Sequence, residues 1–159
     1  MDTLLKLLQN DARLSLEELS DRLGIDTSEV EKQIEALSAN GTILGYHAVV
    51  DRDRTESRDV AALIEVKLTP EREGGFDRLA SRIAKFDQVS SCHLMSGGYD
   101  LAVIVEGRDL REVATFVSEK LSTLEGVIST ATHFQLKVYK QSGFLASTSL
   151  EPNRLPVTP

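Results

Sequence analysis

The chain has 159 residues, 41% hydrophobic and 27% charged, which is the composition of a globular protein able to build a core. It has no apolar run near the roughly 20 residues that span a bilayer, and its N-terminus resembles no signal peptide. Its one cysteine, Cys92, excludes an internal disulfide or a thiolate cluster within one chain. We therefore expect a cytoplasmic protein.

The first forty residues predict three short helices. A leucine stripe marks the first, and Ser15 with Glu18 is the pattern of a capping box at the start of the second. Gly24 suits the turn that follows. Asp26-Thr27-Ser28-Glu29 opens a third helix, which Asn40-Gly41 ends.

Thr42–Val50 is rich in strand-forming residues and predicts a strand or wing, with Tyr46 packed against the helices. The whole of 1–50 then has the pattern of a winged helix-turn-helix domain, whose third helix enters the major groove of DNA. Three helices with a wing also occur in protein–protein modules. If DNA is bound, the side chains in the first two turns that reach the bases are Thr27, Ser28, Lys32 and Gln33.

A second domain follows a polar linker, predicted at 51–59. Alternating strands and helices over 60–140 give the order βαββαβ, a ferredoxin-like α+β domain with two helices on one face of an antiparallel sheet. We expect the last strand to cover Val127–Tyr139, with a bend near Ala131. Three prolines and no periodicity predict an extended tail at 141–159.

The other sheet face has no cover in this order of elements. Leu63, Ala102 and Ile104 are expected to lie there. An apolar face without cover favours packing against a second copy, so we predict a dimer.

Between two predicted strands lies the sequence Ser96-Gly97-Gly98-Tyr99-Asp100. One interpretation is a plain hairpin turn. The other is a binding site, in which the N–H groups of Gly97 and Gly98 hold a carboxylate and Asp100 holds an ammonium group, as the two ends of a free amino acid require.

These motifs resemble the Lrp/AsnC family of feast/famine regulators over about residues 3–140. The resemblance is carried by the helical motifs, by Gly41-Thr42-Ile43-Leu44-Gly45-Tyr46, by His93–Leu101 with its Ser-Gly-Gly-Tyr-Asp-Leu turn, and by Leu124-Glu125-Gly126-Val127. It implies a DNA-binding head and a ligand-sensing body in dimers that often assemble into octamers. It also implies amino acids as effectors, bound near the turn with Tyr99, Thr130 and Thr132 at a subunit interface.

Charge leaves two functions open. Residues 1–50 hold four Lys or Arg against nine Asp or Glu, a net of −5, and Lys32 is the one basic residue of the third helix. The first function is an operator-binding regulator; the alternative is an oligomeric sensing module with weak or lost DNA binding. We expect neither an enzyme nor a cofactor or metal site, because no nucleophile–base pair, phosphate loop or metal motif occurs, and adjacent Cys92 and His93 point to opposite sheet faces.

Overall fold

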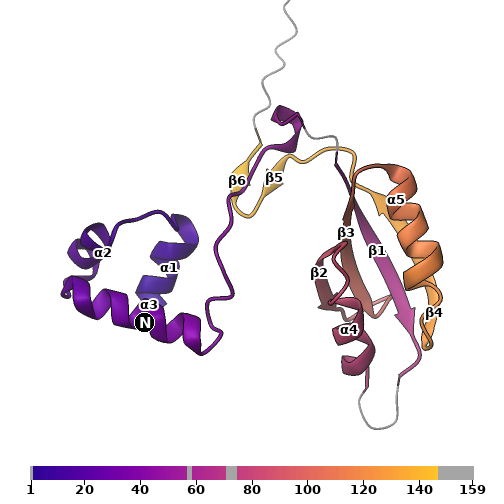
Figure 1. The fold of residues 1–159 in the computed structure, drawn as a ribbon, viewed down its shortest axis with the longest axis horizontal. Helices are drawn as coiled ribbons and strands as arrows, with labels where there is room; N and C mark the ends of the chain where they lie inside the picture. The colour runs from indigo at the N-terminus through magenta and orange to yellow at the C-terminus, as the bar shows by residue number, and fades with distance from the viewer. Residues whose placement is uncertain (1, 57–58, 71–74, 147–159) are drawn as a thin grey trace, which may run out of the picture. The chain divides into compact units, whose positions relative to one another are not determined.

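The computed structural model describes residues 2–56, 59–70 and 75–146. The chain divides into two compact units, residues 1–48 and 49–159, which are described separately here (Figure 1). No helix of the described residues is long and apolar enough to cross a membrane.

The first unit contains the three predicted helices: α1 (Asp2–Asn10), α2 (Leu16–Leu23) and α3 (Thr27–Ala39). The capping box of α2 is confirmed. Ser15 Oγ accepts the N–H of Glu18 at 3.2 Å, and Glu18 Oε2 accepts the N–H of Ser15 at 2.8 Å. Gly24 ends α2 with a φ of 69°, a left-handed conformation that glycine adopts without strain. One buried cluster holds the helices together: Leu4, Leu8, Leu19, Val30 and Leu37.

The predicted wing strand is wrong. Ile43 packs against the helical core and donates its N–H to the Leu37 carbonyl at 3.0 Å, but residues 44–50 form no strand. Leu44 is 95% exposed, and Tyr46, expected to pack on the head, is 54% exposed. Strand-forming side chains make a strand only beside a second strand, and none of the described residues pairs with this segment.

The second unit has the predicted βαββαβ order. Its elements are β1 (Val60–Leu68), α4 (Asp77–Ile83), β2 (Val89–Leu94), β3 (Leu101–Gly107), α5 (Leu110–Thr115) with its π-helical continuation η2 (Phe116–Leu121), and β4 (Val127–Phe134). The four strands form an antiparallel sheet in the order β2-β3-β1-β4.

The helices of this unit pack on one sheet face. Ile64 and Val66 of β1 and Val103 of β3 are fully buried there, against Ile83 of α4 and Leu121 of η2. Alternation along each strand sends every second side chain to this core and the others to the opposite face.

The ends of the sheet differ from the prediction. The last strand stops at Phe134 instead of Tyr139. Its pairing with β1 is irregular opposite Lys67–Leu68, where Ile128 has no partner, and it is regular at Ala131, where a bend was predicted. The residues from 141 do not start as an extended tail: β5 (Lys140–Gln141) and β6 (Phe144–Leu145) form a hairpin. The rest of the predicted tail, 147–159, lies outside the described residues.

The hairpin has a local cause. Its two turn residues, Ser142 and Gly143, have φ values of 48° and 91°. Positive φ at both central residues is the geometry that matches the twist of a two-residue hairpin.

The polar segment 51–59 is partly attached to the second unit. Arg52–Arg54 forms a short 3-10 helix, η1, and the Arg52 guanidinium lies 2.6 Å from Glu106 Oε1 at the end of β3. Both side chains are about one-third exposed or more, so solvent screens this ion pair.

Candidate functional site

The four residues predicted to contact DNA lie on the first two turns of α3. Ser28 and Lys32 are exposed, whereas Thr27 and Gln33 are half-buried. Lys32 makes no hydrogen bond or ion pair within the described residues, and Gln33 Nε2 donates to Glu29 Oε1 at 3.2 Å. The arrangement presents one lysine and one amide, side-chain types that can hydrogen-bond base edges.

Asp26 occupies three backbone donors near the start of α3. Its Oδ1 accepts the N–H of Ser28 at 2.9 Å, and its carbonyl accepts those of Glu29 and Val30 at 3.0 and 3.1 Å. Hydrogen bonds from the side chain and backbone of Ser28 hold the pKa of the Asp26 carboxyl below its usual range. An ionised carboxylate thus stands where a DNA phosphate would approach the helix N-terminus.

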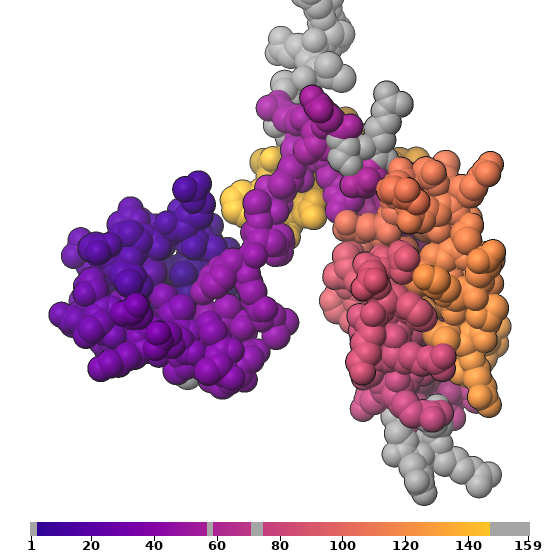
Figure 2. Space-filling model, viewed as in Figure 1, coloured from indigo at the N-terminus to yellow at the C-terminus, as the bar shows by residue number. Residues whose placement is uncertain are grey.

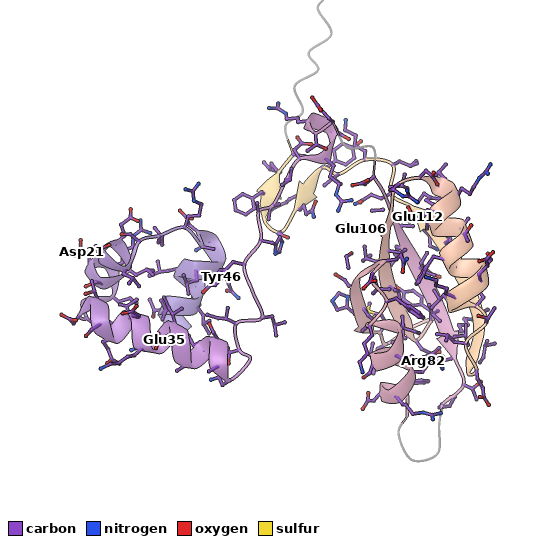
Figure 3. All side chains as sticks on the ribbon, in the orientation of Figure 1. Asp21, Glu35, Tyr46, Arg82, Glu106 and Glu112 are labelled. Carbon is purple, nitrogen blue, oxygen red and sulfur yellow. The ribbon has the colours of Figure 1, made fainter. Side chains whose placement is uncertain are left out.

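Lys32 shares the surface of α3 with several acidic side chains. Glu29, Glu31 and Glu35 are all exposed on the same helix, and Asp21 is exposed on α2 (Figure 3). The predicted acidity of the third helix is therefore a property of its accessible surface. Each uncompensated carboxylate opposes a phosphate backbone, so few cations are available for non-specific attraction.

The second candidate site is the turn between β2 and β3. Gly97 and Gly98 are exposed, and no atom lies within 4 Å of the place where a Cβ of either would be. Gly97 has a φ of 155°, which L residues rarely adopt. The N–H groups of Gly97 and Gly98 donate no hydrogen bond within the described residues, whereas those of Met95 and Asp100 are bonded.

Asp100 ties this turn to the end of β1. Its Oδ2 accepts the N–H of Leu68 at 2.7 Å, and its own N–H donates to the Val66 carbonyl at 3.0 Å. Its carbonyl accepts the N–H of Met95 at 2.8 Å across the turn. The sequence did not reveal this anchoring role, because the Leu68 donor is 32 residues away.

Thr130 and Thr132 lie on β4, which β1 separates from the turn. They pair with Val66 and Ile64, which face the helices, and Thr130 Oγ1 lies 3.1 Å from Ser122 Oγ at the end of η2. Two strand spacings, about 9–10 Å, separate Thr130 from β3. A single protomer therefore brings the four turn residues together but does not bring the two threonines to them.

The sheet face opposite the helices carries the predicted apolar residues. Ala102 is buried and Leu63 and Ile104 are half-buried, although α4, α5 and η2 all pack on the other side. His133 and Glu65 also lie on this face, with His133 Nε2 3.4 Å from Glu65 Oε1. The sequence did not predict this contact. Around its apolar centre this face also carries polar side chains, among them Lys67 of β1, Glu106 of β3 and His93 of β2.

Cys92 and His93 take opposite faces of β2, as the alternation predicts. Cys92 packs against the helix-side core, where burial raises the pKa of its thiol, and His93 is exposed. Within the described residues no group of three or more His, Cys, Asp or Glu is placed to hold a metal ion.

Comparisons with known proteins match both units. The family model described as the AsnC-type helix-turn-helix domain matches residues 3–38, and the model described as the Lrp/AsnC ligand binding domain matches residues 61–145. An uncharacterized HTH-type transcriptional regulator of Bacillus subtilis (strain 168), YugG, is 42% identical over 98% of this chain and 95% of its own. The proline dehydrogenase transcriptional activator of Rhizobium radiobacter is 30% identical over 88% and 89%.

Solved structures with a similar fold are also transcriptional regulators. A transcriptional regulator of Neisseria meningitidis, solved as a complex with L-Met, superposes with a TM-score of 0.67 and 25% identity, covering 94% of this chain and 93% of that one. The matched domains are those of regulators and not of enzymes. The chain therefore belongs to the Lrp/AsnC family: it is a transcriptional regulator with an AsnC-type helix-turn-helix head and a ligand-binding body.

Proposed function

We propose that the protein binds operator DNA as a homodimer and changes its affinity when a free amino acid binds near the β2–β3 turn. The observation that carries this proposal is the presence of an AsnC-type head and a Lrp/AsnC ligand-binding body in one chain. Two separate sites in one molecule allow effector binding and DNA binding to share a coupling free energy. The expected compartment is the cytoplasm, which holds the DNA.

Thr27, Ser28, Lys32 and Gln33 are the proposed DNA contacts. Their support is their position on the first two turns of α3, the part of such a helix that enters the major groove. Because Asp26 accepts the N–H groups of Ser28 and Glu29 in the first turn of α3, the side chains of Lys32 and Gln33 carry most of the proposed recognition.

Gly97, Gly98, Tyr99 and Asp100 are the proposed effector residues. The N–H groups of Gly97 and Gly98 have no acceptor within the described residues and suit a carboxylate, and one Asp100 oxygen is left for an ammonium group after the other has bound Leu68. The L-Met complex of the Neisseria meningitidis regulator supports an amino acid as the ligand class. Thr130 and Thr132 contribute only if a second copy brings its own β4 to the turn, which suits a site at a subunit interface.

The proposed dimer interface is the open face of the sheet, with Leu63, Ala102 and Ile104 at its centre. An uncovered apolar face of a four-stranded sheet is stabilised by a second layer. A two-fold axis would bring this patch against itself and cover both copies at once. Octamers are the larger assembly that the family resemblance implies.

A titration of the protein against the DNA upstream of its own gene tests DNA binding by the helix-turn-helix head. We expect tighter binding to this duplex than to a scrambled one, with a shallow dependence on salt because few cations face the DNA. Equal and weak affinity for both duplexes would instead support the second candidate function, a sensing module without DNA binding, which the acidic surface of α3 favours.

A thermal-shift panel of the twenty amino acids tests the body. A ligand at 100 times its dissociation constant adds about 2.7 kcal/mol to the free energy of unfolding. We expect at least one amino acid to raise the melting temperature. A panel in which none does so contradicts the proposed effector class.

A further inference from the structure

Exposed hydrophobic side chains gather in two short segments. The described residues have eleven large hydrophobic side chains that are exposed, and seven of them lie in residues 44–50, which we call the connector, or in residues 136–145, which we call the arm. The connector contributes Leu44, Tyr46 and Val50, and the arm contributes Leu136, Tyr139, Phe144 and Leu145. A soluble monomer rarely leaves such a concentration uncovered.

The connector has the sequence of a strand but lacks a neighbour. Its three exposed hydrophobic residues have even numbers, so a strand would place them all on one face. None of its backbone groups makes a hydrogen bond within the described residues. Figure 2 shows it as a narrow column of purple atoms. The connector therefore offers a free strand edge together with an apolar side.

The arm is an incomplete sheet. Its strands β5 and β6 are two residues long each, and among the described residues they pair only with one another. A two-stranded hairpin is marginal in water, and a third strand with an apolar face is the usual way to stabilise it. Phe144 and Leu145 are exposed on β6, so an added strand would cover apolar surface as well as backbone.

We infer that the connector of one copy pairs as an added strand with the arm of a second copy. The inference rests on the proposed homodimer and extends its interface beyond the open sheet face. A two-fold axis forms this contact twice, so it covers both connectors and both arms.

Two considerations favour this exchange over two simpler pairings: the charges of the paired segments and the apolar surface that each pairing would cover. Arm against arm would bring Lys137 and Lys140 of both copies together, whereas the connector contains no Asp, Glu, Lys or Arg. Connector against connector would leave Phe144 and Leu145 exposed.

Cross-linking tests which segments meet. Two tagged forms, Tyr46→Cys and Phe144→Cys, both carrying Cys92→Ser, are co-expressed and treated with a short bismaleimide. We expect a covalent dimer that contains both tags. A dimer of Tyr46→Cys with itself as the main product, or no product above the Cys92→Ser background, would overturn the inference.

Sedimentation measurements separate this inference from the dimer itself. Tyr46→Ser with Phe144→Ser should raise the dissociation constant of the dimer by about tenfold or more. The control Leu110→Ser removes a side chain of similar exposure, 55% against 54% for Phe144, and should change nothing. An unchanged constant in the double variant overturns the exchange alone, whereas a monomeric wild-type protein overturns the proposed function as well.

Discussion

At the scale of single residues, Lys32 is the clearest test of the head. It is exposed and unpaired within the described residues, while Glu29 and Glu35 lie three positions away on either side. We predict that Lys32→Glu removes specific binding to the upstream duplex and leaves the fold unchanged. The loss of one contact costs about 1–3 kcal/mol, so the affinity should fall by at least about tenfold.

The matched control is Lys6→Glu, which makes the same charge change at an exposed position of α1. Fluorescence anisotropy of labelled DNA measures both variants, and circular dichroism checks the fold. If the two variants lose affinity equally, the effect is one of net charge, and the contacts lie outside α3.

Asp100 has two roles that substitution can separate. Asp100→Ala leaves the N–H of the buried residue Leu68 without its acceptor, so we predict a loss of about 1–3 kcal/mol in the free energy of unfolding. Asp100→Asn keeps an acceptor and should cost less. Both variants should lose the amino-acid-induced thermal shift, because neither holds an ammonium group by charge. Persistence of that shift in Asp100→Asn would assign Asp100 to anchoring alone.

At the scale of elements, the start of α3 predicts a pH dependence. The pKa of Asp26 is lowered in the folded state by its hydrogen bonds with Ser28, so its stabilising contribution is present above the unfolded-state pKa, about 3.9. It is lost as the pH falls through the lower folded-state pKa. Asp26→Asn still caps the helix but does not titrate.

Thermal melts followed by circular dichroism at pH 7, 5 and 3 measure this effect. We predict that the wild-type protein melts above Asp26→Asn at pH 7 and that the difference shrinks below about pH 4. A difference that stays constant down to pH 3 would show that the Asp26 charge does not stabilise α3.

The elements also show what the sequence could predict. The start of α2 was predictable because Ser15 and Glu18 are three residues apart, and β1 because its alternation is local. The wing and the end of the last strand were mispredicted because a strand needs a second backbone, which the sequence of the segment does not reveal. The hairpin at Ser142-Gly143 had a local signal in the glycine, but the absence of periodicity in the tail obscured it.

The candidate sites also combine features that the sequence predicts with features that it does not reveal. The turn at Gly97–Asp100 was predictable from its glycines, whereas the bonds of Asp100 to Leu68 and of Thr130 to Ser122 depend on contacts distant in sequence. The acidic surface of α3 followed from composition alone, but the hydrogen bonds of Ser28, Glu29 and Val30 to Asp26 needed the structure.

At the scale of the whole molecule, the open sheet face predicts self-association. Ile104→Glu would place a charge on the half-buried centre of that face, where a second copy would bury it without a partner. We predict a monomer for this variant and a dimer for the wild-type protein in sedimentation velocity. The control Leu110→Glu adds the same charge on α5, on the other side of the sheet, and should remain dimeric. If both Ile104→Glu and Leu110→Glu remain dimeric, the dimer interface does not lie on the open sheet face.

The most direct test of a ligand-responsive regulator is a DNA titration in the presence and absence of the amino acid that gives the largest thermal shift. Coupling between two sites is typically about 1–3 kcal/mol, so we predict a change of about 5- to 150-fold in the dissociation constant for the upstream duplex. Binding to that duplex with the same dissociation constant at zero and saturating amino acid would contradict the account.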